Sequence, residues 1–131
     1  MDFNSRDEVW KTINSAYETI RNSDEFEKIV PQKKGVVVTT KIKDLELEYT
    51  ERIGFGKWEL FEGKGNDTDV TLEMNADVHY GMQMGEINPM QAVVKKQLTI
   101  HGVPFKLLRG QKINDKFKDV YKMKVECVEN N

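Results

Sequence analysis

Two short stretches rich in glycine or aspartate are the first candidates for chemistry in this sequence. Gly54-Phe55-Gly56-Lys57 has the residue types of a phosphate-binding loop, but it lacks the GxxxxGK[ST] spacing and precedes an alternating, strand-like segment. Asp67-x-Asp69 has two ligands of a calcium loop, but the rest of that pattern and its closing glutamate are absent. We therefore interpret the first stretch as a hairpin turn and the second as a polar turn.

The histidines and the cysteine are also poorly spaced for a reactive or metal-binding site. His79 and His101 lie far apart, and neither has a partner in an HxxxH or HExxH pattern. Cys127 is the single cysteine, so a CxxC site is excluded. Most carboxylates alternate with apolar residues, which is typical of a solvated sheet face. The sequence therefore predicts no catalytic residue, no metal ligand and no cofactor.

Composition and charge exclude several classes of protein. The chain has 131 residues, of which 38% are hydrophobic and 32% charged, and a formal net charge of −2. A nucleic-acid-binding domain usually carries a basic face, so we expect no nucleic-acid partner. The N-terminus has no signal-peptide pattern, and no apolar run has the ~18 residues of a membrane span. We expect one domain, residues 1–131, in the cytoplasm.

Hydrophobic periodicity predicts the elements that surround these residues. A helix with the capping-box pair Ser5 and Glu8 is expected at 5–22, and a short one at 24–30. Period-two alternation predicts four strands that form an antiparallel meander, at 36–42, 45–50, 57–61 and 70–75. The later elements are a helix from Asn75 to Gly85, a helix at 88–96, a strand at 97–101 and a helical region from Pro104 that Gly110 bends or interrupts.

The methionines are the remaining signal. Five of them fall on or beside elements that should cover the sheet: Met74, Met82, Met84, Met90 and Met123. Methionine is a flexible side chain that fills irregular gaps in an ordinary core. The same property suits a deformable apolar cavity, and the composition alone leaves both interpretations open.

Residues 69–102 carry a pattern with a counterpart in a known family. The pattern is Asp69-x-Thr71-Leu72-x-Met74, then Met82-x-x-Gly85-Glu86-Ile87-Asn88-Pro89-x-x-Ala92, then Leu98-x-Ile100-x-Gly102. It resembles the sterol carrier protein type-two family, also called non-specific lipid transfer proteins. The resemblance implies an α+β fold, with a five-stranded, largely antiparallel sheet, helices covering one face, and an apolar tunnel between them. The chain departs from the family pattern at Lys96-Gln97 and Val103-Pro104.

This resemblance implies a carrier of a sterol, fatty acid, fatty acyl chain or other lipid, with a transient membrane contact and a homodimer as further possibilities. The C-terminal helix is the expected lid. We expect ten residues to contact the ligand: Trp58, Leu60, Met74, Met82, Met90, Ile100, Phe105, Leu108, Phe117 and Tyr121. The first alternative is a non-catalytic interaction or dimerisation module, since similar domains occur as appendages of larger enzymes. The second is a small enzyme, which a buried histidine or carboxylate with a perturbed pKa in a cleft would favour.

Overall fold

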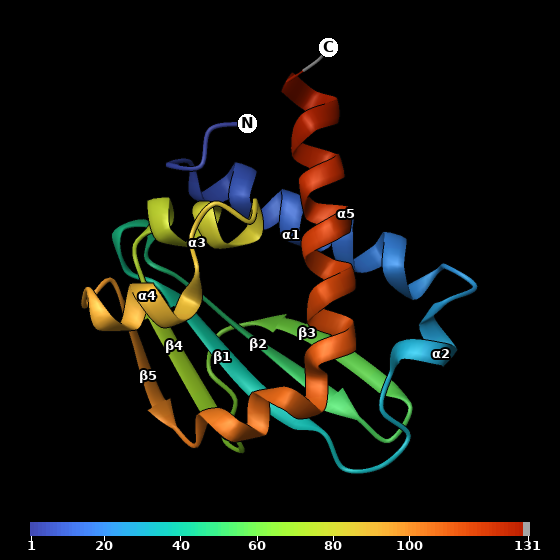
Figure 1. The fold of residues 1–131 in the computed structure, drawn as a ribbon. Helices are drawn as coiled ribbons and strands as arrows, with labels where there is room; N and C mark the ends of the chain where they lie inside the picture. The colour runs from blue at the N-terminus through green and yellow to red at the C-terminus, as the bar shows by residue number, and fades with distance from the viewer. Residues whose placement is uncertain (130–131) are drawn as a thin grey trace.

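A twisted five-stranded sheet with helices packed on one face forms the protein (Figure 1). The computed structural model describes residues 1–129. The strands are β1 (Val36–Ile42), β2 (Leu47–Gly54), β3 (Lys57–Glu62), β4 (Val70–Met74) and β5 (Leu98–Gly102). The helices are α1 (Arg6–Arg21), α2 (Phe26–Ile29), α3 (Ala76–Gln83), α4 (Pro89–Val94) and α5 (Gln111–Glu129), with 3-10 segments η1 (Lys43–Leu45) and η2 (Pro104–Gly110).

The sheet order corrects the expected four-strand meander. The order is β3-β2-β1-β4-β5, and β4 pairs with β1 in parallel, whereas the other neighbours are antiparallel. The connection from β3 to β4 is held against the back of the sheet, where the Thr50 hydroxyl donates to the Gly63 carbonyl over 2.7 Å. At the end of this connection Asp69 accepts from the Val37 amide over 2.9 Å. These bonds carry the chain past β2 to the open edge of β1.

The two faces of the sheet have different chemistry, as the alternation predicts. On the helix-covered face, Leu47, Tyr49 and Ile53 of β2 pack in the main core with α1 and α5. On the other face Thr39 and Thr50 are buried under the loop that precedes β4, and their hydroxyls lie 2.8 Å apart. The predicted cap of α1 is confirmed, because the Ser5 side chain accepts from the Glu8 amide.

The corner between α3 and α4 has the conformation that its sequence predicts. Gly85 adopts a φ of +76°, which a glycine reaches without strain, at the end of α3. Asn88 caps α4 by accepting from the amides of Met90 and Gln91 over 2.8 and 3.2 Å, with Pro89 in the first turn. The start of α3 differs from the expectation, because the Asp44 side chain, not that of Asn75, accepts from the first helical amide.

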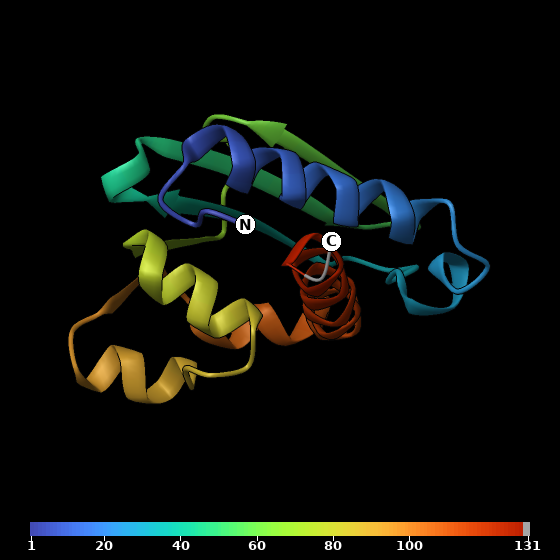
Figure 2. The same ribbon diagram turned by 90° about the horizontal axis from the view of Figure 1, so that it is seen from above.

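The C-terminal region has two parts with different packing. The segment η2 crosses the end of the sheet and finishes at Gly110, where an added Cβ would lie 3.1 Å from the Cδ1 atom of Ile53. The helix α5 then turns away from the sheet and packs against α1, as Figure 1 shows, and Figure 2 views α5 along its axis. It buries Ile113, Tyr121 and Val125 completely or almost so. The expected lid role of this helix is therefore wrong, because removing α5 would remove part of the main core.

Candidate ligand-binding cavity

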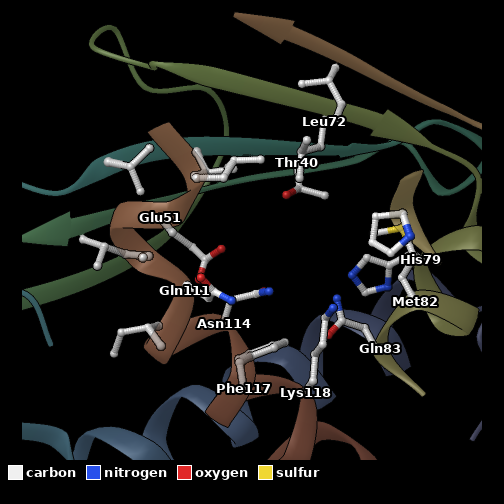
Figure 3. Close-up of a pocket in the computed structure, with 18 of the residues that line it drawn as sticks. Thr40, Glu51, Leu72, His79, Met82, Gln83, Gln111, Asn114, Phe117 and Lys118 are labelled. Atoms are coloured by element: carbon white, nitrogen blue, oxygen red, sulfur yellow. The ribbon is translucent and has the colours of Figure 1, made fainter. Parts of the chain in front are cut away.

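A cavity of about 250 Å³ lies between the sheet and the helices (Figure 3). The sheet provides one wall, α3 and the start of α4 a second, and η2 with the first turns of α5 a third. The lining residues are Val36, Val38, Thr40, Tyr49, Glu51, Ile53, Leu72, Met74, His79, Met82, Gln83, Pro89, Leu98, Ile100, Leu107, Leu108, Gly110, Gln111, Ile113, Asn114, Phe117 and Lys118. Exposed lining residues, among them Leu108, Gln111 and Asn114, mark the mouth.

Inward-facing residues of β1, β4 and β5 make the sheet wall of the cavity apolar. Val38 and Leu72 contribute from adjacent strands, and Ile100 lies opposite Leu72 on β5. Met74 and Met82 close this side from β4 and α3, and both are buried. An apolar wall with flexible thioethers can accept chains of different shape.

Glu51 places a carboxyl group in this mostly apolar space. It stands between Tyr49 and Ile53 on the inward side of β2, so its side chain faces the cavity (Figure 3). The indole nitrogen of Trp58 donates to its Oε1 atom over 3.0 Å. Burial removes water from the carboxylate and raises the pKa of Glu51 to about 7, although the indole hydrogen bond opposes that rise.

His79 is a second titratable group at the cavity, and it is buried. Its Nε2 atom lies 3.2 Å from the hydroxyl oxygen of Tyr49. Burial lowers the pKa of His79 to about 4, so the imidazole is neutral at pH 7. Burial also raises the pKa of Tyr49 far above its usual value. Both groups are therefore neutral hydrogen-bonding partners.

Amide and ammonium groups complete the polar part of the lining. Gln83 is buried, and its Oε1 atom has no hydrogen-bond partner among the described residues. Gln111, Asn114 and Lys118 belong to the first turns of α5 and reach the cavity from its mouth (Figure 3). Polar groups thus come from β2, α3 and α5, whereas the wall that β4 and β5 provide is apolar.

Comparison with known proteins agrees with this geometry. A family model described as the SCP-2 sterol transfer family matches residues 16–114. The chain belongs to this family. No protein of curated function matches it in sequence.

Solved structures show the SCP-2 fold at low sequence identity. The sterol carrier protein 2 of Yarrowia lipolytica, in its apo form, is 13% identical with a TM-score of 0.61, over 74% of this chain and 88% of that one. Sterol carrier protein domain 2 of Helicoverpa armigera is 18% identical with a TM-score of 0.58, over 92% of each chain. A sec-alkylsulfatase from Pseudomonas sp. is 15% identical with a TM-score of 0.53, over 70% of this chain, which spans only 13% of the sulfatase. The predicted family and fold class are confirmed.

The SCP-2 fold brings five of the ten predicted ligand contacts to the cavity. These are Met74, Met82, Ile100, Leu108 and Phe117. Trp58, Leu60 and Tyr121 instead belong to or pack against the main core between α1, the sheet and α5. Met90 and Phe105 are exposed and do not line the cavity. Contact with ligand stays a prediction for the five lining residues.

Sequence analysis missed the polar part of the cavity, above all Glu51. The sequence does contain a signal for this position. Tyr49, Glu51 and Ile53 alternate along one strand and so face the same side of the sheet, and the other inward residues of that strand are apolar. The glycine-rich and aspartate-rich stretches that have the residue types of ligand-binding loops instead have structural roles. Gly54, Phe55 and Gly56 all have positive φ in the β2–β3 turn, and Asp67 binds the Arg52 guanidinium over 2.9 Å. No cluster of residues suited to a metal ion occurs within residues 1–129.

Proposed function

We propose that this SCP-2 family protein binds and carries a hydrophobic ligand, a sterol, fatty acid, fatty acyl chain or other lipid, in the cavity between sheet and helices. The observation that carries the proposal is a space of about 250 Å³ with an apolar sheet wall and an exposed mouth. Family membership and the sterol carrier proteins among the similar structures support it. Each methylene that enters an apolar site gains about 0.8 kcal/mol.

The cavity is smaller than most ligand pockets, which fits a carrier whose cavity widens when it binds a ligand. Ligand pockets usually measure ~300–1,000 Å³, so a long-chain lipid would have to widen this one or protrude from its mouth. A dry cavity of this volume would cost about 6 kcal/mol at ~24 cal/mol per Å³. Met74 and Met82 can change rotamers when a ligand enters, which lets the cavity widen at low cost.

Two measurements test the proposal. Native mass spectrometry of protein purified from its own host should show a bound species, and denaturation should release a lipid. The uncharged fluorophore N-phenyl-1-naphthylamine should become brighter when it binds the purified protein, and long-chain lipids should displace it. A protein that carries no released lipid and leaves the fluorophore unchanged would contradict the proposal.

The titratable groups at the cavity do not make a plausible catalytic site. A buried histidine with a low pKa and a carboxyl with a raised pKa do occur there, which is the feature that would favour an enzyme. Tyr49, the hydroxyl next to His79, has a raised pKa, so it is a poorer nucleophile than an ordinary tyrosine. Glu51 is hydrogen-bonded to an indole and not to a nucleophile. Binding through these groups is therefore the better interpretation.

The rim of the cavity suggests where the protein meets a membrane. Residues 87–114 contain five Lys or Arg and no Asp or Glu, although the whole chain has a net charge of −2. Six large hydrophobic side chains of this segment are exposed: Met90, Val93, Val94, Val103, Phe105 and Leu108. They lie on or beside α4 and η2, whose residues Pro89 and Leu108 line the cavity. Exposed apolar and basic groups together favour an anionic lipid surface.

We infer that α4 and η2 dock on an anionic membrane with the cavity mouth next to the lipid. In Figure 2 these two elements project on the same side of the molecule, and α1 lies on the other. Within residues 1–129, Lys95, Lys96 and Lys112 form no ion pair, so their charges are available to lipid headgroups. The alternative is that a second copy of this chain covers the same exposed apolar side chains of α4 and η2 in a homodimer.

Vesicle binding distinguishes these occupants. The protein should co-sediment with phosphatidylcholine vesicles that contain phosphatidylserine and not with phosphatidylcholine alone. Lys95→Gln with Lys96→Gln should weaken partitioning by roughly tenfold or more, since each basic residue contributes about 1 kcal/mol. Phe105→Ser should also weaken it, whereas Met123→Ser, an exposed methionine on α5, should not. Equal binding to neutral vesicles, or a stable dimer by light scattering that Phe105→Ser disrupts, would contradict membrane docking.

A further inference from the structure

The cavity combines an apolar sheet wall with polar atoms that have no hydrogen-bond partner among the described residues, and this combination bears on the ligand. A ligand that is only a hydrocarbon would match Leu72, Met74 and Ile100 on the sheet wall. It would leave the Oε2 atom of Glu51 and the Oε1 atom of Gln83 without a hydrogen bond. Each buried polar group that loses its partners costs ~1–3 kcal/mol, and a charged group costs more. The lining therefore fits a ligand with a polar end.

One carboxyl oxygen of Glu51 accepts a hydrogen bond, and the other can accept one from a ligand. Its Oε1 atom accepts from the Trp58 indole, which fixes the carboxyl group, and no partner contacts Oε2 in the described part of the chain. Figure 3 shows the carboxyl group directed into the cavity from β2. Above its pKa of about 7 this group is a carboxylate, which accepts hydrogen bonds and has no donor, so the complementary group is a donor.

Gln83 provides a second acceptor from α3. The residue is buried, and its Oε1 atom is solvent-inaccessible and has no partner within residues 1–129. Figure 3 shows Gln83 on the opposite side of the cavity from Glu51. Because Gln83 lines the cavity, rotation of its amide would present this orphaned acceptor to a ligand, and it is a second sign that the missing partner is a hydrogen-bond donor.

We propose that the carried lipid ends in a hydrogen-bond donor, a hydroxyl or ammonium group, that Glu51 accepts, and that the cavity discriminates against lipids ending in a carboxylate. This inference rests on the proposed function and narrows its ligand class. A fatty carboxylate beside Glu51 would bring two like charges together with little water between them. A hydroxyl or ammonium group supplies the missing hydrogen bond and leaves the alkyl chain on the apolar wall.

Lys118 is the cation that could oppose this selectivity. It lines the mouth of the cavity from α5 and is shared with a groove lined by Asp115 and Asp119. These carboxylates offset its charge, and no ion pair joins it to Glu51 in the described residues. A carboxylate lipid held by Lys118 would therefore sit at the mouth, and substitution of Lys118 separates that binding mode from recognition by Glu51.

The test uses three ligands that share one alkyl chain: dodecanol, dodecylammonium and dodecanoate. Displacement of N-phenyl-1-naphthylamine from the protein at pH 8 measures the affinity of each ligand, which is kept below its critical micelle concentration or, for dodecanol, below its solubility limit. We expect the wild type to bind dodecylammonium and dodecanol at least about tenfold more tightly than dodecanoate, because hydrogen bonds to charged groups contribute ~1.5–3 kcal/mol. Glu51→Gln keeps an acceptor for the Trp58 indole. This change should reduce the ratio of dodecylammonium to dodecanoate affinity by roughly tenfold or more.

Glu59→Gln is the matched control, because Glu59 is exposed on β3 and does not line the cavity, and it should leave the affinity for dodecylammonium within about twofold of the wild type. The inference is overturned if dodecanoate binds as tightly as dodecanol, if Glu51→Gln leaves the ratio unchanged, or if Lys118→Gln alone abolishes binding of all three. In each of these cases the fluorophore still binds, so the carrier function stands. If neither the fluorophore nor any of the three ligands binds the folded wild type, the carrier function and this inference fail together.

Discussion

Replacement of Leu72 by tryptophan should weaken binding of N-phenyl-1-naphthylamine by roughly 100-fold. Leu72 projects from β4 into the cavity beside Thr40 (Figure 3). An indole there takes the place of between about three and four methylenes of ligand, each of which would have gained ~0.8 kcal/mol. Because the larger side chain enters space that is already empty, the melting temperature should stay the same or rise.

The control for this prediction is the neighbouring residue on the same strand. Thr71 precedes Leu72, so its side chain faces the opposite side of the sheet, and it does not line the cavity. Thr71→Trp adds a similar bulk to the same strand and should leave the affinity for the fluorophore unchanged within about twofold. Full affinity in a folded Leu72→Trp variant, measured by fluorescence titration beside this control, would show that the fluorophore binds elsewhere.

The second large effect is on how stability depends on pH. Glu51 has a pKa of about 7 in the folded protein against a usual 4.5, so the folded state binds more protons than the unfolded state between these values. The free energy of unfolding therefore falls as pH rises from about 4.5 to 7, by about 3 kcal/mol in total. Glu51→Gln removes this loss, so the variant should be more stable than the wild type at pH 8 and similar to it at pH 4.

His79 changes the free energy of unfolding in the opposite direction over nearly the same pH range. Its pKa falls from 6.5 to about 4 on folding, so the unfolded state binds more protons in that window. This contribution to stability is present above pH 6.5 and is lost as pH falls toward 4. The two contributions nearly cancel in the wild type, and the Glu51→Gln variant should reveal the rise of about 3 kcal/mol that His79 produces between pH 4 and 7.

Urea unfolding of both proteins at several pH values between 4 and 8 measures these effects. The difference between variant and wild type isolates Glu51, since every other titrating group is common to both. Asp69→Asn is not a suitable control, because Asp69 has a lowered pKa and anchors the Val37 amide. A difference that does not change with pH would show that Glu51 titrates normally, and the carboxyl group would then be in contact with water.

Membership in the SCP-2 family supports the proposed carrier function, but it does not identify the ligand. The SCP-2 family model covers residues 16–114, which include every strand and most of the cavity lining. The solved structures share 18% identity or less with this chain in the cases described above, so they establish the fold alone. The ligand class that we propose therefore rests on this chain's own polar residues.

The sequence by itself determined those features that depend on neighbouring residues. The Ser5 cap, the glycine and Asn-Pro corner at residues 85–89, and the apolar and polar alternation of the strands all appear as predicted. Each depends on local backbone geometry or on side-chain period, which a short stretch of sequence specifies. The hairpin turn that we interpret from Gly54-Phe55-Gly56 also depends only on local backbone geometry.

Only the tertiary structure decided the pairing of β4, the role of α5 and the polar side of the cavity. Whether β4 lies beside β1 or β3 depends on contacts between residues far apart in the chain, such as Asp69 with the Val37 amide. Phe105 and Phe117 are equally apolar in sequence, yet one faces solvent and the other lines the cavity. Glu51 has the strand position of a core residue, but its carboxyl group faces a cavity only because helices α3 and α5 leave a space beside it. An unfilled volume is a property of the whole packing, and no single segment encodes it.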